Sequence, residues 1–280
     1  MSARYGFDYR NEPTSAPRAF TNYGRYMSGE ERLLHACDNS DLFHPGALER
    51  LEEYEGYRSA SPFPHVVFDD LFRREALRDV LQEWPRDYNT METHDDGTFV
   101  RKKTGTTWQT DFGPKTNKYF QDLSGARFLM ALERLTGMWG LMGDPYMFGG
   151  GLHSTASGGR LAIHADFNKH PRFGLDRRLN MLIYLNEGWT DLNGGHLELW
   201  DKKMQGCEVS VLPVFNRTVI FTTSRTSFHG QPNPVVAAPD AGRRSMALYY
   251  YSNGRADEGS PPLLDNQHST LWQERPEEGY

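Results

Sequence analysis

Cysteine, long apolar runs and excess positive charge are all scarce in this sequence. Its two cysteines, Cys37 and Cys207, lie far apart, which argues against a disulfide framework or a cysteine-rich zinc site and favours two reduced thiols. A formal net charge of −6 gives no basis for attraction to nucleic-acid phosphates. No run approaches the ~20 apolar residues of a membrane-spanning helix, and the N-terminal stretch lacks the apolar centre of a secretory signal. We therefore expect a cytoplasmic protein without nucleic-acid or membrane partners.

The length and composition are those of a globular protein with a full core. Hydrophobic residues make up 38% of the 280 residues, charged residues 24% and aromatic residues 13%, which is typical of globular chains. We predict a single domain over residues 1–280. It would comprise an N-terminal layer of helices and substrate loops over 1–144, a β core over 145–252 and a tail over 253–280. The sequence sets no oligomeric state.

Helix signals concentrate in the N-terminal half. Residues 30–57 predict two short helices interrupted near 39–45. The stretch "FPHVVFDDLF" predicts a strand, and "RREALRDVLQEWP" after it predicts an amphipathic helix that ends at Pro85. A further helix is expected over 125–138.

After about residue 145 the pattern changes to short apolar or alternating runs separated by glycine, proline and asparagine. These runs are "RLAIHAD", "LNMLIYLN", "GHLELWD", "CEVSVLP", "RTVIFTT" and "RRSMALYYYS". Several short strands with turn signals between them predict a sandwich or barrel-like β domain. The fold class expected is therefore mostly β, with a helical N-terminal layer.

Two His-x-Asp triplets occur, and one of them lies in a predicted strand. His164 and Asp166 in "RLAIHAD" would point to the same side of that strand and offer two metal ligands. His94 and Asp96 lie in "METHDDGT", a polar run that predicts a solvated loop. The nearby basic run "VRKK" is interpreted as a solvated loop or strand edge rather than a binding site. Only the first triplet is therefore a candidate metal site.

A third ligand is available in "RTSFHGQPNP", where His229 follows a predicted strand and opens a turn. Two imidazoles and one carboxylate on one face of an octahedron suit Fe(II) and leave positions open for a cosubstrate and oxygen. The same donors also serve zinc hydrolases. The three ligands alone do not separate these two metals.

The last predicted strand begins with two arginines, Arg243 and Arg244, in "AGRRSMALYYYS". A buried strand rarely starts with a cation unless an anion meets it, and a guanidinium suits a carboxylate through two hydrogen bonds. A metal triad followed by such an arginine indicates a cosubstrate with a chelating end and a distal carboxylate. That description fits 2-oxoglutarate.

These pieces, in this order, resemble the iron(II)/2-oxoglutarate-dependent oxygenase superfamily, in its prolyl-4-hydroxylase-like branch. "HAD", "LIYLN", "GGHLELW", "LPVFNRTVIF", "FHG" and "RRSMALYYYS" stand in the family order, and "SPFPHVVFDDLF" resembles the usual entry into the core. The resemblance implies a double-stranded β-helix (jelly-roll or cupin-like) core over about 145–252. It also implies Fe(II), 2-oxoglutarate and O2, with ascorbate as a candidate reductant.

The resemblance assigns roles to particular residues. His164, Asp166 and His229 fall on the iron ligands. An aromatic six positions further along the last strand selects Arg243 for the cosubstrate carboxylate if it is Tyr249, and Arg244 if it is Tyr250; strand alternation favours Arg243. Tyr184 matches a tyrosine that contacts the same carboxylate, and His153 is the candidate for part of a role that a tyrosine fills in relatives.

Hydroxylation of an unactivated C–H bond, with release of succinate and CO2, is the activity that the resemblance implies. Halogenating relatives carry a small residue at the carboxylate position, so Asp166 favours hydroxylation. The substrate would be a prolyl residue in a peptide or protein, or an amino-acid-derived small molecule. The segment 86–124, with Trp108 and Phe112, and the tail after Asn253 are candidates for shaping its pocket.

Two alternatives belong to other classes of protein. A cupin-type metal-dependent dioxygenase that does not use 2-oxoglutarate would need neither Arg243 nor Arg244. A non-catalytic β-sandwich that binds a sugar or peptide would bind no stoichiometric iron. The sequence does not identify the substrate or the position hydroxylated.

Overall fold

A twelve-stranded antiparallel sheet dominates the part of the chain that the computed structural model describes, residues 40–85, 91–106, 112–238, 241–255 and 267–276. Its strands are β1 His65–Asp69, β2 Met91–His94, β3 Val100–Thr106, β4 Met142–Gly143, β5 Gly151–Ala165, β6 Asp176–Tyr184, β7 Leu197–Trp200, β8 Cys207–Val211, β9 Arg217–Thr222, β10 His229–Gln231, β11 Gly242–Ser252 and β12 Leu271–Trp272. The helices are α3 Ala47–Glu52, α4 Arg74–Gln82, α5 Pro114–Asp122 and α6 Ala126–Thr136, with a short 3-10 helix, η3 Asp191–Asn193. The predicted mostly β fold class is confirmed.

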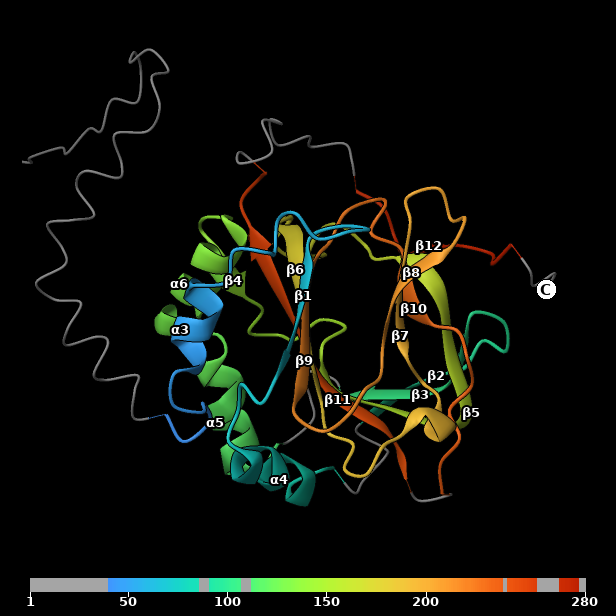
Figure 1. The fold of residues 1–280 in the computed structure, drawn as a ribbon, viewed down its shortest axis with the longest axis horizontal. Coiled ribbons are helices and arrows are strands. Elements are labelled where there is room, and N and C mark those ends of the chain that lie inside the picture. Colours follow the sequence, from blue (N-terminus) through green and yellow to red (C-terminus); the bar gives the residue numbers. More distant parts are fainter. Residues whose placement is uncertain (1–39, 86–90, 107–111, 239–240, 256–266, 277–280) are drawn as a thin grey trace, which may run out of the picture. The chain divides into compact units, whose positions relative to one another are not determined.

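Consecutive strands of the chain are mostly not neighbours in the sheet. Its hydrogen-bonded order is β1-β9-β6-β11-β5-β10-β7-β8, so strands far apart in sequence lie side by side. Figure 1 shows the sheet curling, with the β1–β9–β6–β11 part facing the helices. This winding is that of the predicted double-stranded β-helix core. It brings the start of β10 beside the end of β5, where His229 pairs with His164.

The helices cover one face of the sheet, and the main core lies between them. Leu77 of α4, Leu132 of α6 and Met246 of β11 are fully buried members of this one cluster. The helices predicted around α4 and α6 are confirmed, and α6 ends at Gly137, whose φ of 73° supplies a left-handed cap. Helix α5 was not predicted from its polar sequence "PKTNKYFQD", although its proline stands at the first helical turn.

Strand β11 separates the apolar core from the opposite side of the sheet. Met246, Leu248 and Tyr250 belong to the core behind the helices, whereas Ser245 and Tyr249 line a cavity. Among these residues of β11, the even-numbered ones therefore pack into the core, and the odd-numbered ones face the cavity.

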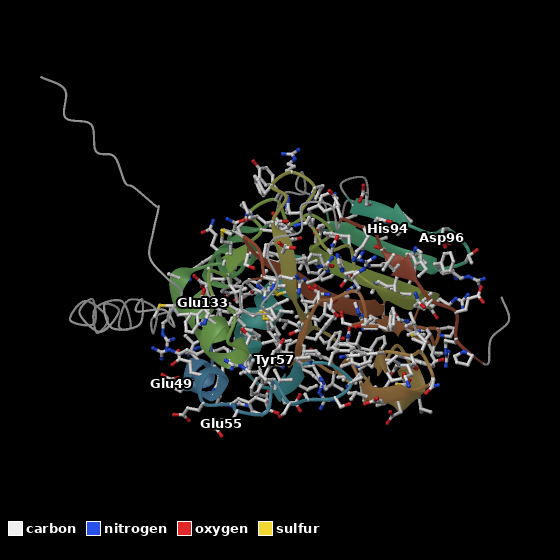
Figure 2. The ribbon with its side chains drawn as sticks, turned by 90° about the horizontal axis from the view of Figure 1, so that it is seen from above. Glu49, Glu55, Tyr57, His94, Asp96 and Glu133 are labelled. Carbon is white, nitrogen blue, oxygen red and sulfur yellow. The ribbon has the colours of Figure 1, made fainter. Side chains whose placement is uncertain are left out.

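Two segments differ from the sequence-based expectation. Residues 91–94 form β2, paired with β3, rather than a solvated loop, and Figure 2 shows His94 and Asp96 on the far side of the molecule from Glu49 and Glu133. The tail expected over 253–280 contains a strand that the sequence did not predict, because Leu271 of β12 pairs with Ala165 of β5.

Other expectations concern residues that lie next to, or within, the parts of the chain that the structure does not describe. Phe112 packs against Phe120 with ring centroids 5.2 Å apart, so it belongs to the core. Trp108 and the helix expected before residue 40 lie outside the described residues. Among the described helices, none has the length and apolar character needed to span a membrane.

Candidate metal centre

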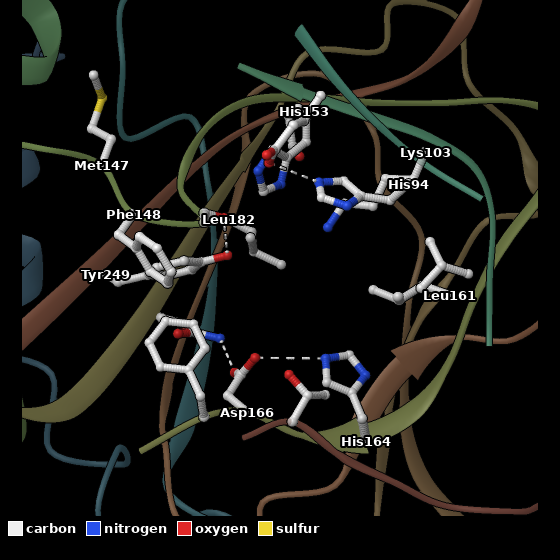
Figure 3. Close-up of a pocket in the computed structure, with 18 of the residues that line it drawn as sticks. His94, Lys103, Met147, Phe148, His153, Leu161, His164, Asp166, Leu182 and Tyr249 are labelled. Atoms are coloured by element: carbon white, nitrogen blue, oxygen red, sulfur yellow. Dashed lines mark hydrogen bonds and ion pairs between the residues drawn. The ribbon is translucent and has the colours of Figure 1, made fainter. Parts of the chain in front are cut away.

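A cavity of about 730 Å³ is walled by strands β2, β3, β5, β6, β10 and β11. Five of the predicted site residues line it, namely His153, His164, Asp166, His229 and Arg243. Figure 3 shows His164 and Asp166 at one end of the space, with His153, His94 and Lys103 at the other. The cavity is within the 300–1,000 Å³ usual for small-molecule sites.

The three predicted ligands converge at one end of the cavity. His164 is next to last in β5, Asp166 directly follows that strand, and His229 opens β10. Oδ1 of Asp166 lies 3.6 Å from Nε2 of His164, and Oδ2 lies 3.4 Å from Nε2 of His229. All three ligand atoms lie within 4.8 Å of one another. This spacing allows a single ion to contact all three.

Both imidazoles are held with Nε2 toward this point. Nδ1–H of His164 donates to the Ala162 carbonyl, and Nδ1–H of His229 donates to the Ser227 carbonyl, each at 2.9 Å. A carbonyl can only accept, so Nδ1 carries the proton and Nε2 of the neutral ring presents a lone pair. Backbone carbonyls orient metal-binding histidines in this way in many proteins.

Asp166 is held ionised by groups that sequence reasoning missed. Its Oδ2 accepts a hydrogen bond from Asn180 Nδ2 at 2.7 Å and lies 3.2 Å from Arg177 Nη2. Burial favours the neutral acid, but Arg177, then His229 and His164, hold the pKa of this carboxyl well below its usual range. The carboxylate is thus available to a cation at neutral pH.

Arg177 is itself a buried residue of β6, only 1% exposed. It donates to Asn180 Oδ1 from Nε at 3.0 Å and from Nη2 at 2.7 Å, and its guanidinium lies 3.5 Å from the Tyr249 ring centroid. Arg177 therefore stabilises the ionised form of Asp166 and holds the Asn180 side chain, whose amide orients the Asp166 carboxylate.

The donor set fits a divalent transition metal. Two neutral imidazoles and one carboxylate are the ligands of the facial triad that non-haem Fe(II) sites use. Burial, partly offset by Asp166, lowers the pKa of His229 to about 4, so its ring is neutral at physiological pH. His164, Asp166 and His229 are the residues that would hold the ion.

The two arginines of β11 point to different places. Arg243 lines the cavity; its Nε donates to the Gly195 carbonyl at 2.6 Å and its Nη2 to the Tyr184 hydroxyl at 3.2 Å. The Arg244 guanidinium lies 5.1 Å from the Trp84 ring centroid, outside the cavity lining. Arg243 is the one whose remaining N–H groups can meet a ligand in the cavity.

Tyr184 and His153 take different positions around Arg243. Tyr184 is fully buried and lies outside the cavity lining, beneath the Arg243 guanidinium at 4.9 Å from its ring centroid. His153 lines the cavity and pairs across the sheet with Ser245. Burial, then Lys103 and His94, hold the pKa of His153 well below its usual range, so it is neutral at physiological pH.

The β2–β3 hairpin forms the far wall of the cavity, which corrects the solvated-loop interpretation of "METHDDGT". The run "VRKK" lies on a strand, as one of its two interpretations expected, but Lys103 lines the cavity. His94 and Lys103 pair across the hairpin, and both line the cavity. Asp96 has a separate task, because its Oδ1 accepts from the backbone N–H groups of Thr98, Phe99 and Val100 and shapes the turn.

Lys103→Met is expected to stabilise the metal-free protein at neutral pH. Burial, partly opposed by Asp166, lowers the pKa of Lys103 from its ordinary 10.5 to about 8, so the charged amine is costly in the folded state. The unfolded chain holds the proton more tightly, so this cost is full below pH 8 and fades as pH rises from 8 to 10.5. At ~1.4 kcal/mol per pKa unit, reduced for partial exposure, we expect a gain of about 1–2 kcal/mol.

Thermal unfolding measures this gain. Tm at pH 7 should rise by roughly 2–8 °C in Lys103→Met, and the difference from the parent protein should shrink by pH 10.5. An equal gain at both pH values would show that side-chain packing, rather than the charge, is responsible.

Aromatic side chains line the wall opposite the hairpin, as Figure 3 shows for Phe148 and Tyr249. The Phe148 ring lies 5.6 Å from that of Phe167. Asp144 holds this loop, because its carboxylate accepts from the backbone N–H groups of Tyr146 and Phe148 at 2.9 and 2.6 Å. This side of the cavity is therefore largely aromatic.

The C-terminal strand β12 covers the metal end of the cavity. The Trp272 ring lies 5.0 Å from the His164 ring and stacks on Phe99, also at 5.0 Å. The tail was expected to help shape the pocket, and Thr270 and Trp272 do line it. In the sequence, only Trp272, a large aromatic residue in a largely polar tail, indicated that this segment packs against the site.

Comparisons with known proteins agree with this architecture. Residues 150–251 match the model of the 2OG-Fe(II) oxygenase superfamily. No curated protein sequence matches the chain. Among solved structures, a prolyl hydroxylase from Trichoplax adhaerens, in complex with a hypoxia inducible factor oxygen degradation domain peptide fragment, is similar with a TM-score of 0.55 and 18% identity; the match covers 76% of this chain and 94% of that one.

Two further solved structures are less similar. A prolyl-4-hydroxylase from Pseudomonas putida gives a TM-score of 0.47 at 18% identity, over 68% of this chain and 92% of that one. HygX from Streptomyces hygroscopicus, with nickel and 2-oxoglutarate bound, gives 0.45 at 12% identity, over 67% and 82%. Residues 150–251 are therefore similar to the 2OG-Fe(II) oxygenase superfamily, and the chain shares the fold of the Trichoplax adhaerens prolyl hydroxylase.

Proposed function

We propose that this protein is an Fe(II)- and 2-oxoglutarate-dependent dioxygenase that hydroxylates an unactivated C–H bond and releases succinate and CO2. The observation that carries the proposal is the placement of the metal-ligand group and Arg243 in one cavity. One end of that cavity offers imidazole and carboxylate donors to a metal, and Arg243 offers N–H donors to a carboxylate. A keto acid with a distal carboxylate matches both.

The chain's own residues hold and orient the reactants. His164, Asp166 and His229 would hold Fe(II), and Arg177 with Asn180 keeps Asp166 ionised and fixed. When bound, iron and 2-oxoglutarate supply the activation of O2, while the protein positions one C–H bond and limits water.

Arg243 would bind the far carboxylate of 2-oxoglutarate through charge-assisted hydrogen bonds. Tyr184 is a positioning residue in this proposal, since its hydroxyl accepts from Nη2 and its ring supports the guanidinium. His153, neutral on the cavity wall beside Ser245, can exchange hydrogen bonds with the same ligand.

We propose hydroxylation rather than halogenation because a carboxylate, Asp166, occupies the third ligand position. Removal of that carboxylate would leave no protein anion among the ligands. For the substrate we propose a prolyl residue of a peptide or an amino-acid-derived small molecule, on the strength of the motif resemblance. Substrate loops vary most among enzymes that share one core.

An anaerobic titration tests the proposal. Fe(II) is added to the metal-free protein and then 2-oxoglutarate, and we expect a weak visible absorption band only when both are present. The band should be absent in His164→Ala and retained in the cavity-lining control His94→Ala. If iron binds and 2-oxoglutarate leaves the spectrum unchanged, the arginine argument fails, and a metal-dependent dioxygenase that does not use 2-oxoglutarate replaces it. A protein that binds no stoichiometric iron would be a binding module.

A further inference from the structure

Lys103 is a cation on the cavity wall that the proposed chemistry does not use. It lies mid-way along β3, and Figure 3 shows its side chain reaching into the space across from Asp166 and His164. Its neighbours on the strand behave differently. Arg101 Nε donates to the Gly97 carbonyl and Lys102 Nζ to the Ser157 carbonyl, and both residues are exposed. Lys103 alone of the three turns inward.

The ammonium of Lys103 has no hydrogen-bond or ion-pair partner among the described residues. Glu92, an acidic residue of the hairpin that also lines the cavity, lies instead 3.6 Å from His94 Nε2. Asp166, at the other end of the cavity, is engaged by Asn180 and Arg177. A half-buried amine with no partner costs stability, as its lowered pKa of about 8 indicates. Such a group is retained where a ligand supplies the missing charge.

The described side chains beside Lys103 on the cavity wall form no ion pair with it. His153 is neutral at physiological pH, and Thr155, which pairs with Lys103 across β3 and β5, is uncharged. Leu161 closes the side nearer the metal end (Figure 3). Burial, Arg243 and Arg177 disfavour the charged amine and Asp166 only partly opposes them, so a small carboxylate would be favoured over a neutral group here.

The cavity then holds two separate cations, Arg243 and Lys103, and the proposed function assigns only Arg243. Resting on that function, we propose that Lys103 binds an anionic group of the substrate itself, so that the substrate is a small carboxylic acid. Its body would lie between the hairpin and the aromatic wall that includes Phe148 and Tyr249. A cavity of about 730 Å³ has room for a cosubstrate and a molecule of this size.

Calorimetric titration with matched acids and amides tests the proposal. Phenylacetate and phenylacetamide, and N-acetyl-L-proline and its amide, are titrated anaerobically into the full-length chain loaded with Fe(II) and N-oxalylglycine, which occupies the cosubstrate position without reacting. We expect at least one acid to bind more tightly than its amide. Lys103→Met should weaken that acid by about 10- to 100-fold and leave the amide unchanged. Lys102→Met, on the same strand, is the matched control and should change neither.

Three results separate the possible failures. If no acid binds better than its amide, or if Lys103→Met binds the acids as the parent does, the proposal is overturned. If Lys103→Met weakens 2-oxoglutarate while Arg243→Met does not, Lys103 anchors the cosubstrate, and the proposal is again overturned. If the parent binds no 2-oxoglutarate at all, the proposed function fails, and the acid–amide comparison on the metal-free Lys103→Met and Lys102→Met proteins still decides the role of Lys103.

Discussion

Asp166→Ala is expected to lower Fe(II) affinity by at least ~100-fold, which is the upper end of what loss of an outer-shell partner costs at metal sites. The substitution removes the one anionic ligand of the group. It also leaves Arg177 a buried cation without its carboxylate and Asn180 Nδ2 without its acceptor. Turnover of 2-oxoglutarate to succinate should be lost with the metal. Iron content after dialysis and succinate release measure the two effects.

Folding must be monitored in the same variant. Removing one member of a buried ion pair lowers the free energy of unfolding by about 3–5 kcal/mol, so thermal unfolding decides whether lost iron reflects an unfolded chain. Asp166→Asn keeps the side-chain volume and serves as a second variant. His94→Ala is the control within the other His-x-Asp triplet and should retain iron. Full iron binding and activity in Asp166→Ala would show that the ligand assignment is wrong.

Arg243→Met is expected to raise the KM for 2-oxoglutarate by about 100-fold, because truncating one partner of a buried charge pair costs ~2–5 kcal/mol. Arg243 is 9% exposed, and Gly195 and Tyr184 hold its guanidinium in place. Iron binding should be unchanged, since Arg243 makes its hydrogen bonds to Gly195 and Tyr184 and to none of the three ligands. Succinate formation against 2-oxoglutarate concentration gives KM, and a metal assay gives the iron content.

The adjacent arginine supplies the matched control. Arg244 turns toward Trp84 and lies outside the cavity lining, so Arg244→Met should leave KM near that of the parent protein. A large increase in KM for Arg244→Met with none for Arg243→Met would reverse the assignment. Intact activity in the double variant would favour an enzyme that does not use 2-oxoglutarate.

The core of the site was predictable because its residues lie in strands with clear patterns. "RLAIHAD" alternates apolar and polar positions, so the common direction of His164 and Asp166 followed from strand geometry alone. His229 was proposed because it follows a predicted strand and opens a turn, and the resemblance then placed it on an iron ligand. The sheet pairs it with His164. Pattern and topology therefore agree at the metal end.

Arg177 was missed although the rule that singled out Arg243 applied to it as well. Strand β6 reads "DRRLNMLIY" and is buried along nearly its whole length. A buried strand that begins with arginines needs anions to meet them, and for Arg177 that anion is Asp166. The arginines at the start of this strand were visible in the sequence, but the rule was applied only to those of β11.

Lys103 and His94 were missed for a different reason. Apolar alternation identifies strands whose inner face meets an apolar core, whereas the inner face of the β2–β3 hairpin meets a polar cavity. Its inward residues are therefore as polar as its outward ones, and the run resembles a solvated loop. Only the β-branched residues of "VRKKTGTT" hinted at a strand.

The carbonyl contacts of the two histidines have a consequence for metal selection. Each ring is tied to the backbone two residues before it, so its rotamer freedom is lost when the chain folds and not when an ion arrives. An ion thus meets donors that are already set in place, with little reorganisation left to favour one metal over another. Among divalent ions, occupancy would then follow intrinsic donor preference and supply in the cell, and the identity of the working metal becomes a property of the environment as much as of the chain.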